Sequence, residues 1–251
     1  MNISFTSISA AMPKKIAIIG ATSGIGRALA VEMHGRGYIV GATGRREQRL
    51  QKLQKEQGKD FYIQPMDVTE YDQAIQQLNQ FIQQLGGLDI IVLNAGISTS
   101  GEVSMRETDL KVIAVNITGL ANLAAHSFSY FEEKGHGHIV GVSSVASQFA
   151  WGKSASYNAS KAFVNRYLQG YRQKANHSAA AISVTNLMPG YVQSEMTKHK
   201  KGLFWVASAS KAAQQMADAI ESKKSRAYIT RRWRLIAWLI KLTPQWLWNR
   251  M

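Results

Sequence analysis

Short apolar runs rich in β-branched residues alternate along the chain with longer amphipathic stretches. The short runs stop at Gly, Asn, Asp or Ser, as buried strands do, and the longer stretches carry apolar residues at helical spacing. Strands are predicted at residues 14–20, 38–46, 61–68, 88–96, 138–144, 181–190 and 226–230. Because strands and helices alternate without a linker, we expect a doubly wound α/β fold, with a parallel sheet of about seven strands and helices on both faces.

The same pattern divides the chain into three parts. Residues 1–13 are predicted to be a flexible extension, with Met12 as an alternative start to Met1. Residues 14–230 form the predicted catalytic domain, and residues 231–251 follow as a basic, Trp-rich helical extension. The sequence has no run of about 18 apolar residues and no signal-peptide pattern, so we expect a cytoplasmic protein.

Cysteine and histidine usage argues against metal sites. The chain has no cysteine, which excludes disulfides and thiolate ligands. Its six histidines show no metal-ligand spacing. His136 and His138 are expected in the loop before the fifth strand. No metal is predicted.

Positive charge is concentrated at the C-terminal end. The formal net charge is +14, and from Lys223 onward the chain has eight basic residues and no Asp or Glu. Such a segment is typical of contact with an anionic surface, either phospholipid or nucleic acid. The sequence has no motif that reads nucleic acid, so no nucleic-acid partner is expected.

The last segment, 231–251, has two interpretations. If it is helical, four apolar side chains share one face, and three tryptophans flank them among arginines. The four are Leu235, Trp238, Leu239 and Leu242, and the tryptophans are Trp233, Trp246 and Trp248. This composition suits a helix lying in the plane of a membrane interface, here the inner surface of the membrane. A helix packed on the subunit or across a dimer interface would show the same pattern.

A glycine-rich loop follows the first predicted strand and opens a helix. Gly20, Gly24 and Gly26 let the backbone turn sharply and approach a ligand, and the helix N-terminus offers free N–H groups to a pyrophosphate. The spacing departs from G-x-G-x-x-G, and the Gly-Lys-Ser/Thr ending of an NTP-binding loop is missing. A plain strand-to-helix turn would account for the loop equally well.

A phenol and an ammonium group lie four residues apart at Tyr157 and Lys161. On a helix the two share a face, and a nearby positive charge lowers the pKa of a phenol toward the working range of a general acid or base. Ser144, thirteen residues upstream, has a hydroxyl that can bond to the same oxygen, and the spacing favours it over Ser143. Alone, the pair could also be an ordinary amphipathic pair on a helix.

Together, GATSGIG, LNAG, N-I-T-G and Y-x-x-x-K make the chain similar to the short-chain dehydrogenase/reductase family, over roughly residues 14–230. The resemblance implies that Ser144, Tyr157 and Lys161 are catalytic, and that Asn116 opens its helix and supports a proton relay through water. It implies hydride transfer between a nicotinamide and a carbonyl or secondary alcohol. Relatives commonly pair through the helices that carry Asn116 and Tyr157, so a homodimer or homotetramer is expected.

The resemblance also assigns the cofactor contacts. The place of the acidic residue in NAD-binding relatives is held by Gly44, and Arg45 follows it, so NADP(H) is predicted over NAD(H). Asp67 is expected either at the adenine or as the N-cap of the next helix, and Asn94 is expected to be mainly structural. The predicted cofactor-binding residues are Gly20, Thr22, Ser23, Gly24, Ile25, Gly26, Arg45, Asp67, Val68, Asn94, Ala95, Gly96, Tyr157, Lys161, Pro189, Gly190, Val192 and Ser194.

The substrate is less closely specified. Residues 195–208 lie where relatives carry a mobile lid, and their apolar side chains, with Phe149 and Trp151, suggest a lipophilic carbonyl or alcohol as the small-molecule substrate. Buried packing explains the same residues equally well. Because NADPH usually serves reduction, a reductase is expected. The rivals are a non-catalytic NADP(H)-binding regulator and a membrane-docked adaptor of the same fold.

Overall fold

The protein is described here from a computed structural model that covers residues 12–98, 104–198 and 202–243. Residues 1–11 of the predicted N-terminal extension lie outside these ranges, and with them the question of whether Met1 or Met12 is the start. The flanking Trp246 and Trp248 also lie outside them. So do residues 199–201 of the predicted lid.

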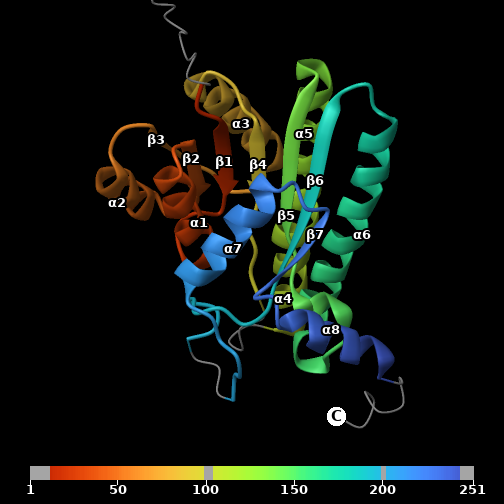
Figure 1. The fold of residues 1–251 in the computed structure, drawn as a ribbon. Helices are drawn as coiled ribbons and strands as arrows, with labels where there is room; N and C mark the ends of the chain where they lie inside the picture. The colour runs from red at the N-terminus through yellow and green to blue at the C-terminus, as the bar shows by residue number, and fades with distance from the viewer. Residues whose placement is uncertain (1–11, 99–103, 199–201, 244–251) are drawn as a thin grey trace, which may run out of the picture.

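Seven parallel strands form one sheet in the order β3-β2-β1-β4-β5-β6-β7 (Figure 1). They are β1 Lys15–Ile19, β2 Ile39–Gly44, β3 Phe61–Pro65, β4 Ile90–Leu93, β5 His136–Val142, β6 Ala181–Pro189 and β7 Arg226–Ile229. Successive side chains of a strand point to opposite faces, so Ile16 and Ile18 enter one apolar core and Ala17 and Ile19 the other. The predicted fold class is confirmed.

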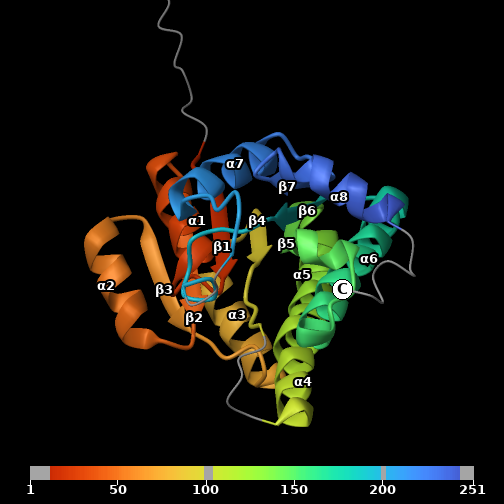
Figure 2. The ribbon, with the colours of Figure 1, turned by 90° about the horizontal axis from the view of Figure 1, so that it is seen from below.

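Helices cover both faces of the sheet (Figure 2). They are α1 Gly24–Gly35, α2 Glu47–Gln57, α3 Tyr71–Leu85, α4 Met105–Ile113, α5 Leu120–Lys134, α6 Ala155–His177, α7 Ala209–Glu221 and α8 Trp233–Leu242. Three short segments complete them, a π-helical one at Ala114–Gly119 and 3-10 turns at Val145–Gln148 and Gly152–Ser154. Buried residues of α1, α2 and α7 form one core with the sheet, and those of α3, α5 and α6 form the other.

The strand order reverses between β1 and β4, which are neighbours in the sheet. From β1 the chain winds outward to β2 and β3, and from β4 it winds the other way to β7. The loops that leave β1 and β4 therefore diverge and leave a crevice at the carboxyl ends of the strands, which is where ligands bind in open parallel sheets. The glycine-rich loop and the LNAG segment both lie at this edge.

One continuous helical stretch, Met105–Lys134, meets the length and composition of a membrane span, with a mean hydropathy of 1.2 over its best window. Half of that window is buried inside the protein. The buried residues of the stretch include Leu123, Phe128 and Phe131, which belong to the core beside the sheet. The stretch therefore packs as a core helix of the α/β fold.

Two local predictions are wrong. His136 belongs to strand β5 instead of the loop before it, because the strand continues its pairing with β6 past its apolar part. His138, predicted both in that loop and as the first residue of the strand, lies within the strand. Asp67 does not cap α3, whose N-cap is Glu70. The Asp67 carboxylate instead accepts hydrogen bonds from the backbone N–H and the hydroxyl of Thr69, which fixes a turn after β3.

His138 makes the stability of the fold sensitive to acid. Its side chain is 3% exposed, its Nε2 lies 2.8 Å from Thr185 Oγ1, and burial, assisted by Lys223 and Lys14, lowers its pKa from 6.5 to about 4. Between these two values the unfolded chain binds a proton that the folded protein does not. Stability is therefore complete above pH 6.5 and is lost as the pH falls toward 4.

Because of the lowered pKa of His138, we expect the free energy of unfolding to fall by roughly 2 kcal/mol between pH 7.5 and pH 5. Urea denaturation of the protein and of His138→Gln at both pH values measures this. The glutamine side chain does not titrate, so the variant should lose correspondingly less on acidification. Equal losses in the two proteins would show that His138 does not contribute.

Candidate active site

The loop after β1 forms a cradle of bare backbone at the N-terminus of α1. Gly20 and Gly24 have φ angles of +92° and +57°, which favour glycine. A Cβ on Gly26 would lie 2.2 Å from the carbonyl oxygen of Gly20, and one on Gly24 would lie 3.2 Å from Ser194 Cβ. The side chain of Ser23, the N-cap of α1, makes no capping hydrogen bond to the helix. A helix N-terminus in such a cradle suits the pyrophosphate of a dinucleotide.

The segment after β4 closes one side of this cradle. Asn94 Nδ2 donates to the carbonyl oxygen of Gly20 at 2.7 Å, which ties the two loops together and supports its structural interpretation. Ala95 packs against Gly20, where a Cβ would lie 2.7 Å from the Ala95 Cα. A Cβ on Gly96 would lie 3.2 Å from Lys161 Nζ and 3.4 Å from Asn116 Oδ1. A side chain at position 96 would therefore collide with the predicted catalytic groups.

Two arginines follow β2, and they point differently. Arg45 is mostly exposed, with its Nη1 3.7 Å from Asp67 Oδ2. Arg46 turns back over the glycine-rich loop, donating to Thr22 Oγ1 from Nε at 3.0 Å and to Ser23 Oγ from Nη2 at 2.6 Å. Its Nη1 also pairs with Glu195 at 2.6 Å.

Glu195 links this edge of the crevice to the segment after β6. Arg49 of α2 pairs with the same carboxylate, and hydrogen bonds from Arg46 and Arg49 lower the pKa of Glu195 to about 2. The carboxylate is therefore charged at neutral pH. The sequence interpretation selected only Arg45 as a cofactor contact here. Arg46 could have been selected because it adjoins Arg45, but no pattern in the sequence indicated Glu195.

Ser144 and Tyr157 meet at the carboxyl end of β5. The Ser144 side chain lies near enough to Tyr157 to lower the pKa of its phenol, and Ser144 Oγ donates to the carbonyl oxygen of Pro189 at 3.3 Å. The neighbouring Ser143 is buried and donates to Asn186 Oδ1 at 2.9 Å, away from Tyr157. The geometry thus distinguishes the two serines in the way that the spacing predicted.

The prediction that the pKa of Tyr157 is lowered is wrong. Burial raises the pKa of Tyr157 above 10 and outweighs the effect of the Ser144 side chain, which lowers it. Lys161 Nζ lies 5.8 Å from the centre of the Tyr157 ring and donates to the carbonyl oxygen of Val142 at 3.0 Å. The ammonium group is itself 5% exposed, and burial lowers the pKa of Lys161 to about 8.

Asn116 lies in the π-helical segment Ala114–Gly119, so the expected local opening of the helix is present. Its side-chain amide is fully engaged: Nδ2 donates to the Ile97 carbonyl at 2.9 Å and to Ser160 Oγ at 3.0 Å, and Oδ1 accepts from the Ile97 N–H at 2.9 Å. Asn116 therefore holds the backbone after the LNAG segment against α6.

A second asparagine, Asn158, was missed by the sequence interpretation. It is buried, and its Nδ2 donates to the carbonyl oxygens of Ala146 at 2.9 Å and Phe149 at 3.0 Å. These bonds fasten the turn that carries Ser144 to the helix that carries Tyr157. The residue follows Tyr157 directly, but a single asparagine in a helical pattern gave no reason to select it.

The remaining predicted cofactor contacts lie around the same crevice. Gly190, after β6, has no room for a side chain, because a Cβ would lie 2.1 Å from Trp233 Nε1. Val192 pairs by a backbone bridge with Ala207, just before α7, and the Ser194 N–H donates to Thr197 Oγ1 at 3.0 Å. Val68 packs against Gly119, where a Cβ would lie 2.6 Å from the Val68 carbonyl oxygen.

A model of the short chain dehydrogenase family matches residues 14–202. The chain belongs to this family. An uncharacterized oxidoreductase of Myxococcus xanthus is 35% identical over 185 residues, 72% of each chain. The NADP-dependent 3-hydroxy acid dehydrogenase YdfG of Escherichia coli is 31% identical over 180 residues, 70% of this chain and 72% of that one.

Solved structures agree with the family and the fold. The closed form of a serine dehydrogenase complexed with NADP+ superposes with a TM-score of 0.74 at 26% identity, over 82% of this chain and 88% of that one. A short-chain dehydrogenase/reductase from Burkholderia phymatum in complex with NAD gives a TM-score of 0.82 at 18% identity, over 90% of this chain and 92% of that one, which shows the fold alone.

This short-chain dehydrogenase fits a dinucleotide at its crevice. Two glycine-containing loops, a helix N-terminus and two arginines lie together where the strand order reverses. Among the described residues, no group of three or more His, Asp or Glu side chains could hold a metal ion.

Aromatic side chains gather beside Tyr157 in this dehydrogenase. Tyr191 is near enough for its charge to raise the pKa of Tyr157, and its ring lies 6.1 Å from that of Phe204 and 5.3 Å from that of Trp233. Trp233 is the buried first residue of α8. Phe204 and Trp205 remain about half exposed, so the predicted lid carries an apolar surface open to solvent.

Proposed function

We propose that the protein is an NADP(H)-dependent reductase of lipophilic carbonyl compounds. One observation carries the proposal: Tyr157 has Ser144 close to its hydroxyl and the buried Lys161 beside its ring, next to a glycine-lined crevice. A proton donor, an orienting hydroxyl and a positive charge thus converge where the carbonyl oxygen of a substrate would lie.

The raised pKa of Tyr157 suits reduction. At neutral pH the phenol keeps its proton, so Tyr157 can give it to a carbonyl oxygen as negative charge develops there. Ser144 would hold the same oxygen by a hydrogen bond. Lys161 would stabilise the resulting phenolate and bind the ribose hydroxyls of the nucleotide. A bound nicotinamide would supply the hydride.

Asn116 supports the site by position. Its amide fixes the backbone at Ile97 and the hydroxyl of Ser160, one residue before Lys161. This places the π-helical segment beside Lys161, where a chain of water could return a proton to Tyr157. The proposed relay would use backbone groups of that segment, because the side chain is already engaged.

NADP(H) is proposed over NAD(H) because Arg45 and Arg46 follow β2 and no carboxylate stands at their position. A guanidinium group binds a 2′-phosphate well, whereas a carboxylate would repel it. YdfG of Escherichia coli and the serine dehydrogenase structure are NADP proteins by name. A more distant structure of the same fold holds NAD, so the proposal rests mainly on the arginines.

The rate of NADPH oxidation with aldehydes and ketones of increasing chain length tests this proposal. We expect turnover that improves with chain length, because the aromatic side chains beside Tyr157 gain contact with a longer substrate. The rate should fall as the pH rises through about 8, where Lys161 loses its proton. Tight NADPH binding without turnover of any carbonyl would instead support the rival, a cofactor-binding regulator.

A further inference from the structure

Among residues 12–98, 104–198 and 202–243, helix α8 packs on the protein by one face. Trp233 and Ala237 are buried and pack with Val145 in a small apolar cluster. The opposite face carries Leu235, Trp238, Leu239 and Leu242, and each of these side chains is more than half exposed. The predicted apolar stripe therefore exists, but it points to solvent while a different face makes the packing contact.

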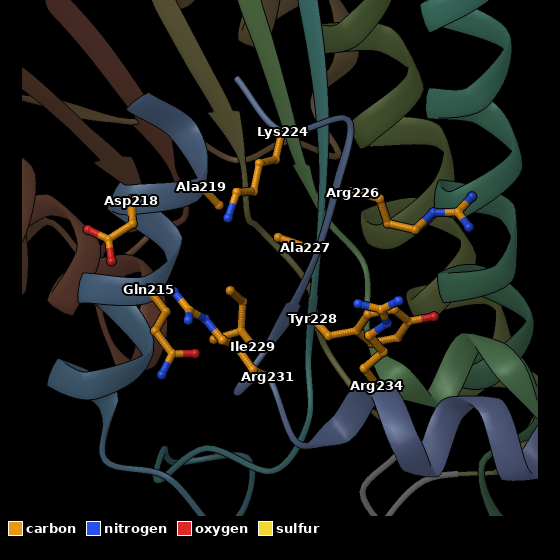
Figure 3. Close-up of a pocket in the computed structure, with 10 residues that line it drawn as sticks. All are labelled: Gln215, Asp218, Ala219, Lys224, Arg226, Ala227, Tyr228, Ile229, Arg231 and Arg234. Atoms are coloured by element: carbon orange, nitrogen blue, oxygen red, sulfur yellow. The ribbon is translucent and has the colours of Figure 1, made fainter. Parts of the chain in front are cut away.

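A basic pocket lies beside this helix, between α7, β7 and α8 (Figure 3). Its volume is about 440 Å³, and its lining includes Lys224, Arg226, Arg231 and Arg234. Arg234 belongs to α8 and directly precedes Leu235 of the exposed apolar face. The pocket and the apolar face thus adjoin.

The positive charge of the pocket is not neutralised. Asp218 is the one acidic residue of the lining, and its carboxylate pairs with Arg36 on the far side at 2.9 Å. Across residues 12–98, 104–198 and 202–243, no ion pair is formed by any of the four basic side chains. The sequence beyond Lys223 supplies no Asp or Glu either.

We propose that the outer face of α8 and the basic pocket form one docking surface for an anionic phospholipid membrane. Helix α8 would lie in the plane of the interface with its leucines and Trp238 among the acyl chains, and the pocket would take the phosphate of a lipid headgroup. An exposed apolar stripe bordered by arginines is the composition of an in-plane interfacial helix, and tryptophan is enriched at that depth. Basic side chains near the surface add attraction to anionic lipid.

Other occupants fit the surface less well. A symmetric pairing of α8 with a second copy would bring the basic pockets of the two copies toward each other, and like charges repel. Nucleic acid would contact the cations but would leave the leucines in water. The docking surface goes beyond the proposed reductase activity and does not depend on it.

Sedimentation with vesicles tests the surface in the full-length protein. Vesicles of phosphatidylcholine alone are compared with vesicles containing one third phosphatidylglycerol. We expect binding to the anionic vesicles that weakens as salt is added. Lys224→Gln with Arg226→Gln should weaken this binding by about tenfold or more, and Leu235→Glu with Leu239→Glu should weaken it on the order of a hundredfold.

Matched controls make the same chemical changes elsewhere. Lys52→Gln with Lys55→Gln removes two exposed charges from α2, and Met105→Glu places an acid on the exposed start of α4. Both should bind the vesicles like the parent protein. All substituted side chains lie on the surface, and thermal melting checks that each variant folds.

Several results would overturn the proposal. The parent protein could fail to sediment with anionic vesicles, or the pocket variants could bind as the α2 control does. The parent protein could also self-associate, as measured by light scattering, without binding vesicles. If Leu235→Glu with Leu239→Glu then abolished the self-association, α8 would join two copies. Binding of millimolar inorganic phosphate that is lost in Lys224→Gln with Arg226→Gln, without any vesicle binding, would make the pocket a site for a soluble anion.

Discussion

Replacing Tyr157 by phenylalanine should lower turnover by roughly a thousandfold or more while NADPH binding is retained. The change removes only the hydroxyl that we propose as the proton donor, and general acid catalysis contributes effects of this size. The ring stays beside Lys161, and the glycine-rich loop is untouched. Steady-state rates with a lipophilic aldehyde and a fluorescence titration with NADPH measure the two quantities.

Ser144→Ala is the partner experiment, because Ser144 lies beside Tyr157 and should orient the same substrate oxygen. Its turnover should also fall, but less than that of Tyr157→Phe, since the proton donor remains. Ser143→Ala serves as the control, because its hydroxyl bonds to Asn186 instead. A Tyr157→Phe enzyme with near-normal turnover would exclude the proposed mechanism.

Changing the two arginines after β2 should abolish the preference for NADPH. A charged hydrogen bond contributes on the order of 2 kcal/mol, so Arg46→Ala should raise the Kd for NADPH about 30-fold and leave the Kd for NADH nearly unchanged. Arg45→Asp should go further and favour NADH, because the carboxylate would repel a 2′-phosphate and accept a hydrogen bond from a ribose hydroxyl. Fluorescence titrations with both nucleotides give the ratio.

Arg27→Ala is the matched control for these variants, since Arg27 is an exposed arginine of α1 that pairs with Glu56. Its nucleotide preference should equal that of the parent protein. If Arg45→Asp and Arg46→Ala leave the ratio of the two Kd values unchanged, the 2′-phosphate is not recognised at this position, and the NADP(H) proposal fails while the reductase chemistry is still open to test.

The fold was largely predictable because most of the inner strands are short apolar runs buried on both faces. The prediction failed where polar residues belong to a strand. His138 is buried in β5 because Thr185 of the adjoining strand offers its side chain a partner, and a single sequence does not show such a pairing. The N-cap of α3 was predicted wrongly for a similar reason, because the Asp67 carboxylate accepts a hydrogen bond from the backbone N–H of Thr69, before the helix begins.

Predictions for the candidate site depended on whether spacing along the chain determines position in space. Tyr157 and Lys161 share a helix, so their proximity followed from spacing alone. The sign of the Tyr157 pKa shift did not, because burial and the nearby charge of Tyr191 both depend on parts of the chain that are distant in sequence. Likewise, two adjacent arginines are equivalent in sequence, whereas only Arg46 turns back over the glycine-rich loop.

Trp233 joins the C-terminal helix to the reaction site. Its indole fills the space under Gly190 and contacts the rings of Tyr191, Phe204 and Trp205, while Arg232 donates to the Trp205 carbonyl at 2.9 Å. If a substrate binds beside these rings as proposed, helix α8 forms a wall of that substrate chamber as well as an outer surface. Truncating the chain before residue 231 would remove that wall. A truncated protein would therefore lose both turnover and membrane binding, and the two effects could not be distinguished. Only substitutions on the outer face can separate the effects, and a membrane that held α8 would also hold the opening of the chamber against the lipid.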